Sequence, residues 1–466
     1  MVERRIELSR LKRVHLVGIG GMHMSAIASI LLSRGVTVTG SDIAPSPFTE
    51  RLEREGATVY PRHDAANLGD PDLVVATVAA KETNPEILAA RERKIPLVIR
   101  AEMVAALMEG RIAVCVAGTH GKTTTSSLLA YALREAGRDP TYLLGGDSVD
   151  LGRNAAPGNG PEIVVEADEY AEAFLHYSPD IALVTNVEVD HLDYYRTEER
   201  LFGAFAAFMA RVRPDGTLIV CADSPRLVEL VERSTNGSQP PVRARIESYA
   251  LDRVADWTAR IVEGGAHQVF SVEREGQPFG VFTTPLAGRH SVSNCLGAIA
   301  TLHTLGIGLP DMQRTIAGFH GARRRFEHVG EVSGVTIMDD YAHHPTEIAV
   351  NIAAARDRFP GRRLVIVFQP HTFSRTSYLF DGFRSCFDGA DKVLLLQTYA
   401  ARENAGAGMD AHQLADAMSP RPDVAEDLNE AVSWLGANTR RGDVVFTMGA
   451  GTVDAVGKAF TGSAPV

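Results

Sequence analysis

Short runs of consecutive apolar residues, each followed by a glycine-rich or polar turn, recur from the start of the chain. Runs at residues 13–17, 36–40, 73–77 and 97–99 are typical of strands that helices cover on both faces. Between the first two runs, residues 24–34 predict a helix that ends at Gly35. This alternation of strand, turn and helix predicts a doubly wound α/β domain over residues 1–107.

The same alternation starts again twice further along the chain. A β-branched run at 112–117 leads through a glycine turn into a long helix, and further strands are predicted at 163–165 and 181–185. Strands at 364–368, 393–396 and 444–448 predict another α/β unit after residue 323. Because a domain commonly has about 100–200 residues, the chain of 466 residues is predicted to form three domains, over 1–107, 108–323 and 324–466.

Composition narrows the class of protein. Hydrophobic residues make up 45% of the chain and charged residues 23%, which is typical of globular domains. A net charge of -11 argues against nucleic-acid binding, and no apolar stretch approaches the roughly 20 residues that span a bilayer. The four cysteines lie far apart without a CxxC pair, so we expect no disulfide framework and a reducing, cytoplasmic location. The chain is expected to be a monomer or a homodimer.

The strongest local signal is a phosphate loop between the strand at 112–117 and the following helix. In such a loop the backbone N–H groups and the helix N-terminus face phosphate oxygens, a lysine reaches the β- and γ-phosphates, and a threonine hydroxyl can bind Mg²⁺. The usual first glycine of the pattern is replaced by Val116. The loop has the sequence Gly118-Thr119-His120-Gly121-Lys122-Thr123-Thr124.

Two acidic clusters follow predicted strands of the same domain. Glu166-Ala167-Asp168-Glu169 comes directly after the strand at 163–165, and Asp190-His191 follows the strand at 181–185. Ligands of open α/β sheets bind at the carboxyl ends of strands. Carboxylate and imidazole groups beside a phosphate loop therefore predict a magnesium site that serves two anionic substrates.

Several motifs occur in the order typical of the Mur ligases, and the chain resembles that family along nearly its whole length. The block His343-His344-Pro345 and the turn Gly18-Ile19-Gly20-Gly21 are most similar to the branch that adds L-alanine. The other motifs are the phosphate loop, the two acidic clusters, Thr185-Asn186-Val187, Gly288-Arg289-His290 with Asn294, Arg324-Arg325-Phe326, and the segment 339–347.

The resemblance implies a fold with three parts: a Rossmann-like N-terminal domain for a UDP-sugar, a central P-loop ATPase-like domain with a mostly parallel sheet, and a Rossmann-like C-terminal domain for an amino acid. It also implies the chemistry. ATP would phosphorylate the carboxylate of UDP-N-acetylmuramate, and the amine of L-alanine would attack the acyl phosphate, releasing ADP and phosphate. These small molecules are the expected partners, and Mg²⁺ is the expected cofactor.

The resemblance further implies roles for individual residues. The UDP-sugar would contact Gly18, Gly20, Gly21, Ser41, Asp42 and His63, and the amino acid would contact Tyr341, His343 and Arg375. ATP would contact Gly118, Thr119, His120, Gly121, Lys122, Thr123, Thr124, His290, Asn294, Arg325 and Asp340. Magnesium would be held by Thr123, Glu166 and His191, and the catalytic residues would be Lys122, Glu166, His191, Arg325 and His343.

Three alternatives stay open at this point. Asp42 follows the first glycine turn at the spacing of the acidic residue that binds ribose in NAD-dependent oxidoreductases, although His23 replaces the third glycine of that pattern. A non-catalytic sensor of ATP and UDP-sugar is the second, and it would not need the metal-binding residues. The third is the recycling Mur ligase that adds an intact tripeptide, in which cysteine usually stands at the position of Gly20.

Overall fold

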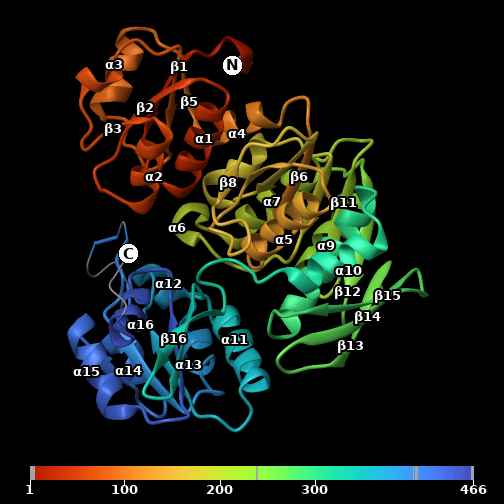
Figure 1. The fold of residues 1–466 in the computed structure, drawn as a ribbon, viewed down its shortest axis with the longest axis vertical. Coiled ribbons are helices and arrows are strands. Elements are labelled where there is room, and N and C mark those ends of the chain that lie inside the picture. Colours follow the sequence, from red (N-terminus) through yellow and green to blue (C-terminus); the bar gives the residue numbers. More distant parts are fainter. Residues whose placement is uncertain (1–5, 238–239, 402, 405–407, 463–466) are drawn as a thin grey trace. The chain divides into compact units, whose positions relative to one another are not determined.

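The computed structural model describes residues 6–237, 240–401, 403–404 and 408–462. Over these residues the chain forms three β-sheets of five, ten and six strands, with helices packed against them (Figure 1). The predicted α/β class with a largely parallel sheet in each part is therefore confirmed. The chain divides into two compact units. The first comprises residues up to Glu188, Glu198–Thr258 and Leu296–Thr315, and the second comprises Val189–Thr197, Ala259–Cys295 and the chain from Ile316 onward.

The N-terminal sheet is parallel and has the strand order β3-β2-β1-β4-β5. The chain moves outward from β1 to β3 on one side and then continues with β4 and β5 on the other, so the order switches beside the carboxyl end of β1. Such a switch point is where open α/β sheets bind ligands. The strands are β1 (Arg13–Val17), β2 (Thr37–Ser41), β3 (Thr58–Tyr60), β4 (Leu73–Ala76) and β5 (Leu97–Ile99), and the helical segments are η1 (Leu8–Arg10), α1 (Met22–Ser33), α2 (Pro47–Glu55), η2 (Ala65–Leu68), α3 (Pro85–Glu92) and α4 (Arg100–Met108).

Two glycines allow the close contacts at this switch point. Gly18 has a φ of +79°, and a Cβ there would lie 2.7 Å from Cγ2 of Thr77. A Cβ on Gly40 would lie 2.6 Å from the carbonyl oxygen of Leu16 on the neighbouring strand. Because neither position has room for a side chain, β1, β2 and the turn after β1 can lie close together.

The central sheet of the first unit has the order β12-β11-β10-β6-β9-β7-β8. Strand β6 is flanked by parallel neighbours, and five of its six residues are buried, which explains its continuous apolar sequence. The strands are β6 (Ile112–Ala117), β7 (Thr141–Leu143), β8 (Ala155–Ala156), β9 (Glu162–Glu166), β10 (Ile181–Val184), β11 (Thr217–Cys221) and β12 (Arg245–Ala250), and the helical segments are α5 (Lys122–Glu135), η3 (Tyr170–His176), α7 (Glu198–Met209) and α8 (Pro225–Thr235).

After β12 the chain forms three further strands that the sequence pattern did not predict, and two of them pair antiparallel. Strand β13 (Trp257–Glu263) begins parallel to β12, and β14 (Gln268–Arg274) and β15 (Gln277–Thr284) form an antiparallel hairpin. Along β14, buried residues alternate with more exposed ones, as expected for a sheet with one solvated face. Helices α9 (Arg289–Thr304) and α10 (Leu309–Gly318) follow.

The C-terminal sheet has the order β16-β17-β21-β18-β19-β20, and only β16 is antiparallel to its neighbour. Buried aromatic side chains such as Phe368, Phe383 and Phe446 fill the core on one side of it. The strands are β16 (Glu327–Val332), β17 (Val335–Asp340), β18 (Leu364–Phe368), β19 (Lys392–Leu396), β20 (Asp423–Ala425) and β21 (Val444–Met448). The helices of this unit are α6 (Leu192–Tyr195), α11 (Pro345–Arg358), α12 (Phe373–Tyr378), α13 (Phe380–Ser385), α14 (Ala411–Ala417), α15 (Leu428–Asn438) and α16 (Asp454–Phe460).

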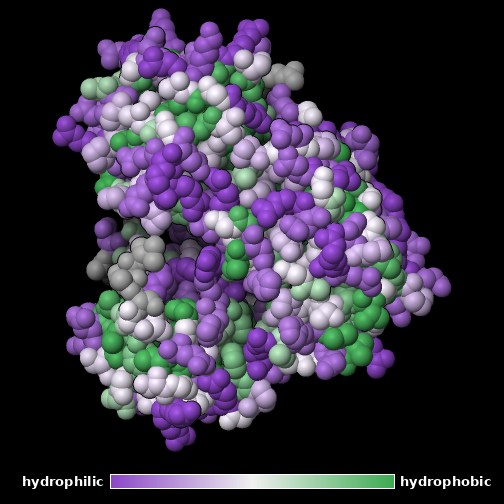
Figure 2. All heavy atoms as spheres, viewed as in Figure 1, coloured by the Kyte–Doolittle hydropathy of each residue, from purple (hydrophilic) through white to green (hydrophobic). Residues whose placement is uncertain are grey.

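Hydrophilic residues cover much of the face drawn in Figure 2. Within the described part of the chain, no helix is both long and apolar enough to cross a membrane. All four cysteines are buried, and none of them forms a disulfide.

Replacing Gly40 by alanine tests the close packing of β1 on β2. Because the new Cβ would overlap the Leu16 carbonyl, the backbone must shift, and we expect a loss of about 1–3 kcal/mol in the free energy of unfolding. Thr37→Ala, at the exposed start of the same strand, is the matched control. Urea unfolding of both variants measures the difference. Equal midpoints would show that the strands have more freedom than the structure indicates.

Candidate active site

The phosphate loop connects β6 to α5 and depends on two glycines with positive φ. Gly118 has a φ of +132°, and a Cβ there would lie 2.1 Å from the hydroxyl oxygen of Thr185. Gly121 has a φ of +81° and is the N-cap of α5. Glycine adopts these angles most readily, and the structure has the strand, glycine turn and helix that the sequence predicts here.

The segment after β10 holds this loop in place. The hydroxyl of Thr185 donates to the carbonyl of His120 at 2.6 Å, and the side chain of Asn186 both accepts from His120 N at 2.9 Å and donates to its carbonyl at 3.1 Å. The backbone N–H of Thr119 donates to the Asn186 carbonyl at 3.1 Å. The Thr185-Asn186 motif thus has a physical role, because it fixes the curvature of the loop before any ligand binds.

Lys122 forms a buried ion pair with Glu169. The ammonium nitrogen lies 2.8 Å from one carboxylate oxygen of Glu169 and 2.9 Å from the other, and it also donates to the Thr119 carbonyl at 3.1 Å. Burial alone would lower the pKa of Lys122, but the charges of Glu169 and Glu166 outweigh burial and hold that pKa above its ordinary value. Lys122 is therefore charged and directed toward the loop, as binding to a triphosphate requires.

Glu166 and Thr123 lie against the same short glycine segment. The backbone N–H of Gly145 donates to Glu166 at 2.8 Å, and a Cβ on Gly145 would lie only 2.1 Å from a carboxylate oxygen of Glu166. A Cβ on Gly146 would lie 3.3 Å from Cγ2 of Thr123. Both side chains are largely buried. The Glu166 carboxylate and the methyl group of Thr123 thus lie against one glycine pair, and the carboxylate and the Thr123 hydroxyl are hard oxygen donors of the kind that suits Mg²⁺.

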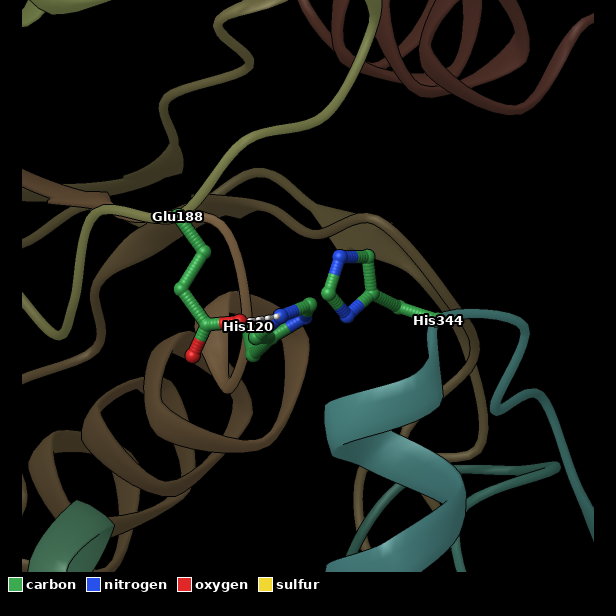
Figure 3. Close-up of side chains that lie close together, drawn as sticks. All are labelled: His120, Glu188 and His344. Carbon is green, nitrogen blue, oxygen red and sulfur yellow. Dashed lines mark ion pairs between the residues drawn. The ribbon is translucent and has the colours of Figure 1, made fainter. Parts of the chain in front are cut away.

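The loop histidine His120 also takes part in an ion pair. Figure 3 shows its ring directed toward the carboxylate of Glu188, and the two groups are 3.5 Å apart. The third residue drawn in Figure 3, His344, belongs to the second unit. There it is the N-cap of α11 and accepts from Thr346 N at 3.2 Å.

In the N-terminal domain, the predicted sugar-nucleotide residues lie around the turn after β1. Gly18 N and Ile19 N donate to the carbonyl of Ser41 at 2.8 and 3.1 Å, and Gly20 N donates to the Asp42 carboxylate at 2.9 Å. The Ser41 hydroxyl lies 2.7 Å from Nδ1 of His63. The structure therefore brings the predicted glycines, Ser41, Asp42 and His63 together at the switch point of the sheet.

His23, which replaces the third glycine of the dinucleotide-binding pattern, is linked to the acidic cluster after β9. Nδ1 of His23 accepts from the guanidinium of Arg100, which also donates to Asp168 at 3.0 Å. Burial, assisted by the charge of Arg100, lowers the pKa of His23 to about 4. His23 is thus neutral at pH 7. The sequence did not predict Arg100, because nothing in its local pattern distinguishes it from an ordinary residue at the start of a helix.

In the second unit, two of the predicted ATP residues are engaged within the protein. Asp340 is buried and accepts from the backbone N–H groups of Phe326 and Ala342, both at 2.7 Å. Burial raises the pKa of Asp340 to about 6. Arg325 lies 3.4 Å from Glu347 and above the Tyr341 ring. Burial also lowers the pKa of His290, which precedes Asn294 by one turn of α9, to about 4.

The residues that were predicted to bind the amino acid, Tyr341, His343 and Arg375, also belong to the second unit. His343 lies 2.9 Å from the carbonyl of Tyr341 through Nδ1, and Arg375 is paired with Asp190 at 2.9 Å. Arg375 also donates to the His371 carbonyl. His191, the predicted metal ligand, belongs to this unit and lies 3.9 Å from the carboxylate of its neighbour Asp190. The partner of Arg375 in this structure is thus a carboxylate of the chain itself.

Comparison with known proteins gives the family directly. Residues 13–111 match the catalytic domain of the Mur ligase family, residues 116–302 match the Mur ligase middle domain, and residues 324–451 match the Mur ligase glutamate ligase domain. The chain belongs to the Mur ligase family. Its three-domain α/β architecture is the architecture of this family, so the alternative of an NAD-dependent oxidoreductase is dropped.

Relatives of this Mur ligase match it over nearly its full length. A UDP-N-acetylmuramate–L-alanine ligase from Solidesulfovibrio magneticus is 41% identical and covers 96% of this chain and 97% of its own, and one from Roseiflexus sp. is 42% identical over 95% and 97%. Among solved structures, a UDP-N-acetylmuramate–alanine ligase from Thermotoga maritima has a TM-score of 0.81 at 27% identity, covering 97% of this chain and 99% of its own. A murein peptide ligase from Psychrobacter arcticus has a TM-score of 0.71 at 25% identity, with coverage of 97% and 99%.

The variant His343→Asn tests the neutral state of this ring, whose side chain is 17% exposed. Burial lowers the pKa of His343 to about 3, whereas the same ring in the unfolded chain titrates near 6.5. Between these values only the unfolded chain takes up the proton, so the free energy of unfolding falls as the pH decreases from 6.5 toward 3. Asparagine can keep the bond to the Tyr341 carbonyl without titrating.

We therefore expect the difference in stability between pH 7 and pH 5, measured by urea unfolding, to be smaller by about 2 kcal/mol in His343→Asn than in the unchanged protein. His267→Asn, at an exposed position of the second unit, is the control. An equal pH dependence in all three proteins would contradict the neutral state of His343 in the folded protein.

Proposed function

We propose that this chain joins L-alanine to the carboxylate of UDP-N-acetylmuramate with consumption of ATP, in the synthesis of peptidoglycan precursors in the cytoplasm. The observation that carries the proposal is the preformed phosphate loop with a charged Lys122, in a chain whose relatives of about 40% identity are named as ligases of this specificity. Such a reaction serves cell-wall growth, cell shape and cell division. We assign UDP-sugar binding to residues 1–107, ATP binding to 108–323 and amino-acid binding to 324–466.

The first step is the transfer of the γ-phosphoryl group to the carboxylate. A carboxylate oxygen of the sugar attacks the γ-phosphorus, the bond to the β,γ-bridging oxygen breaks, and ADP leaves. The backbone N–H groups of residues 121–124, at the N-terminus of α5, orient the triphosphate, and Lys122 neutralises the charge that develops on the transferred group. In the second step the amine of alanine attacks the acyl carbon, the amine loses a proton, and phosphate leaves.

Magnesium supplies further neutralisation of phosphate charge when bound. Thr123 and Glu166 would hold it, because both lie against the pair Gly145-Gly146 and offer oxygen ligands. We propose His191 as a further ligand. In the second unit, His290, Asn294, Arg325 and Asp340 are proposed for the nucleotide, and Tyr341, His343 and Arg375 for the amino acid. Arg375 would have to exchange Asp190 for the carboxylate of alanine.

The proposed reaction is tested by phosphate release from ATP in the presence of Mg²⁺, UDP-N-acetylmuramate and single amino acids. We expect release only with both the UDP-sugar and L-alanine. Lys122→Ala removes the charge that stabilises the transferred phosphoryl group, so the rate should fall by about 100-fold or more. Arg134→Ala, on the exposed side of the same helix, should stay within about twofold of the unchanged protein.

Other outcomes assign other functions. Release with the tripeptide L-alanyl-γ-D-glutamyl-meso-diaminopimelate, but with no single amino acid, would identify a recycling ligase. Binding of ATP and the UDP-sugar without release for any acceptor would identify a sensor. Equal rates in Lys122→Ala and Arg134→Ala would refute the role of the phosphate loop.

Gly145→Ala tests the proposed magnesium site independently. The added Cβ would displace the Glu166 carboxylate, so the Mg²⁺ concentration for half-maximal phosphate release should rise about tenfold or more. Gly203→Ala is the control, because a Cβ at that position meets no atom within 4 Å. If Gly145→Ala and Gly203→Ala needed the same Mg²⁺ concentration for half-maximal phosphate release, Glu166 would be excluded as a ligand.

A further inference from the structure

Glu86 places a carboxylate in the interior of the N-terminal domain. It is the second residue of α3, and its side chain has no exposed surface. An ionised carboxylate is unfavourable in such a place unless hydrogen-bond donors surround it. The Ser41 hydroxyl donates to it at 2.5 Å and the Asn67 amide at 2.9 Å. His15, on β1, lies 3.5 Å away.

These donors keep Glu86 charged. Burial acts to raise its pKa, but His15, Ser41 and Asn67 together lower the pKa of Glu86 to about 2. Glu86 therefore only accepts hydrogen bonds at neutral pH. Its partners come from β1, β2 and η2 as well as the segment between β3 and η2, so this one carboxylate connects most of the elements around the carboxyl end of β2.

The charge of Glu86 determines how Ser41 and His63 present their polar atoms. Because the Ser41 proton points to Glu86, the Ser41 oxygen can only accept from His63 Nδ1, which lies 2.7 Å from it. Nδ1 of His63 also lies 3.3 Å from Glu86. These contacts select the tautomer of the imidazole that carries its proton on Nδ1 and leaves Nε2 as an acceptor.

The location of this pair connects it to the ligand site. Ser41 is the last residue of β2, and its carbonyl accepts from the turn that follows β1. The side chain of His63 is 25% exposed, whereas that of Glu86 is 0% exposed. A ligand at the switch point can therefore reach His63 but not Glu86.

We propose that Glu86 is a positioning residue for the sugar nucleotide, which fixes the Ser41 hydroxyl and the His63 ring so that Nε2 of His63 accepts from a hydroxyl or imide N–H of the uridine. This inference rests on the assignment of UDP-sugar binding to the N-terminal domain. Glu86 acts through its neighbours and takes no part in the chemical steps.

Calorimetric titration of the full chain with UDP, without ATP or alanine, tests the inference. Glu86→Gln keeps the shape of the side chain but brings an amide among donors, so the Kd for UDP should rise about tenfold while the Kd for ATP stays within about twofold. Glu92→Gln, at the exposed end of the same helix, should leave both constants unchanged. Thermal unfolding of each variant shows whether the domain is folded.

A double-variant cycle separates positioning from a general structural role. If Glu86 acts through His63, the variants Glu86→Gln and His63→Asn should raise the Kd for UDP to similar extents. The Kd of the double variant should then be no higher than that of the single variant with the higher Kd. An unchanged Kd for UDP in folded Glu86→Gln, an equal loss of ATP affinity, or additive losses in the double variant would each overturn the inference. Because UDP binding needs no alanine, a chain that binds UDP but releases no phosphate would refute the proposed function alone.

Discussion

The ion pair between Lys122 and Glu169 is the interaction on which the phosphate loop depends. A lysine ammonium enclosed by a loop requires a negative charge nearby, and removing one partner of a buried pair typically costs about 3–5 kcal/mol. Glu169 supplies this charge from the acidic cluster after β9, and the Thr185-Asn186 segment fixes the backbone around it. A carboxylate of the chain itself thus balances the charge of the lysine in the loop.

Buried carboxylates have the same physical role in each of the three domains. Glu86 accepts from groups around the switch point of the N-terminal sheet, Glu166 accepts from Gly145 in the central domain, and Asp340 accepts from two backbone N–H groups in the C-terminal domain. Each one holds loop segments that have no regular secondary structure of their own. This arrangement explains why acidic residues in this chain gather at the carboxyl ends of strands, where the chain must turn sharply.

The sequence predicted the parts of the structure that local patterns determine. The strand, glycine turn and helix around Lys122 and the order of the three α/β parts were read from runs of apolar residues and from motifs. The hairpin β14–β15 was missed because its alternating pattern is weak and its partner strands belong to no motif. The pairs of Glu86 with Ser41 and of Arg375 with Asp190 join residues 45 and 185 positions apart, and no periodicity indicates such contacts. The resemblance to the Mur ligases gave residue roles, but it could not tell that Asp340 and Arg375 have partners within the chain.

Because the four cysteines are buried, their reaction with a thiol reagent can report local unfolding of the chain. Cys115 and Cys221 lie in strands of the first unit, whereas Cys295 and Cys386 belong to the second. Burial raises the pKa of Cys295 to about 12, and it moves the pKa values of Cys115 and Cys386 in the same direction. A thiol reagent attacks the thiolate, which is scarce at neutral pH while these side chains stay enclosed. Labelling with such a reagent therefore follows transient unfolding, and the cysteine that reacts identifies the unit that opened.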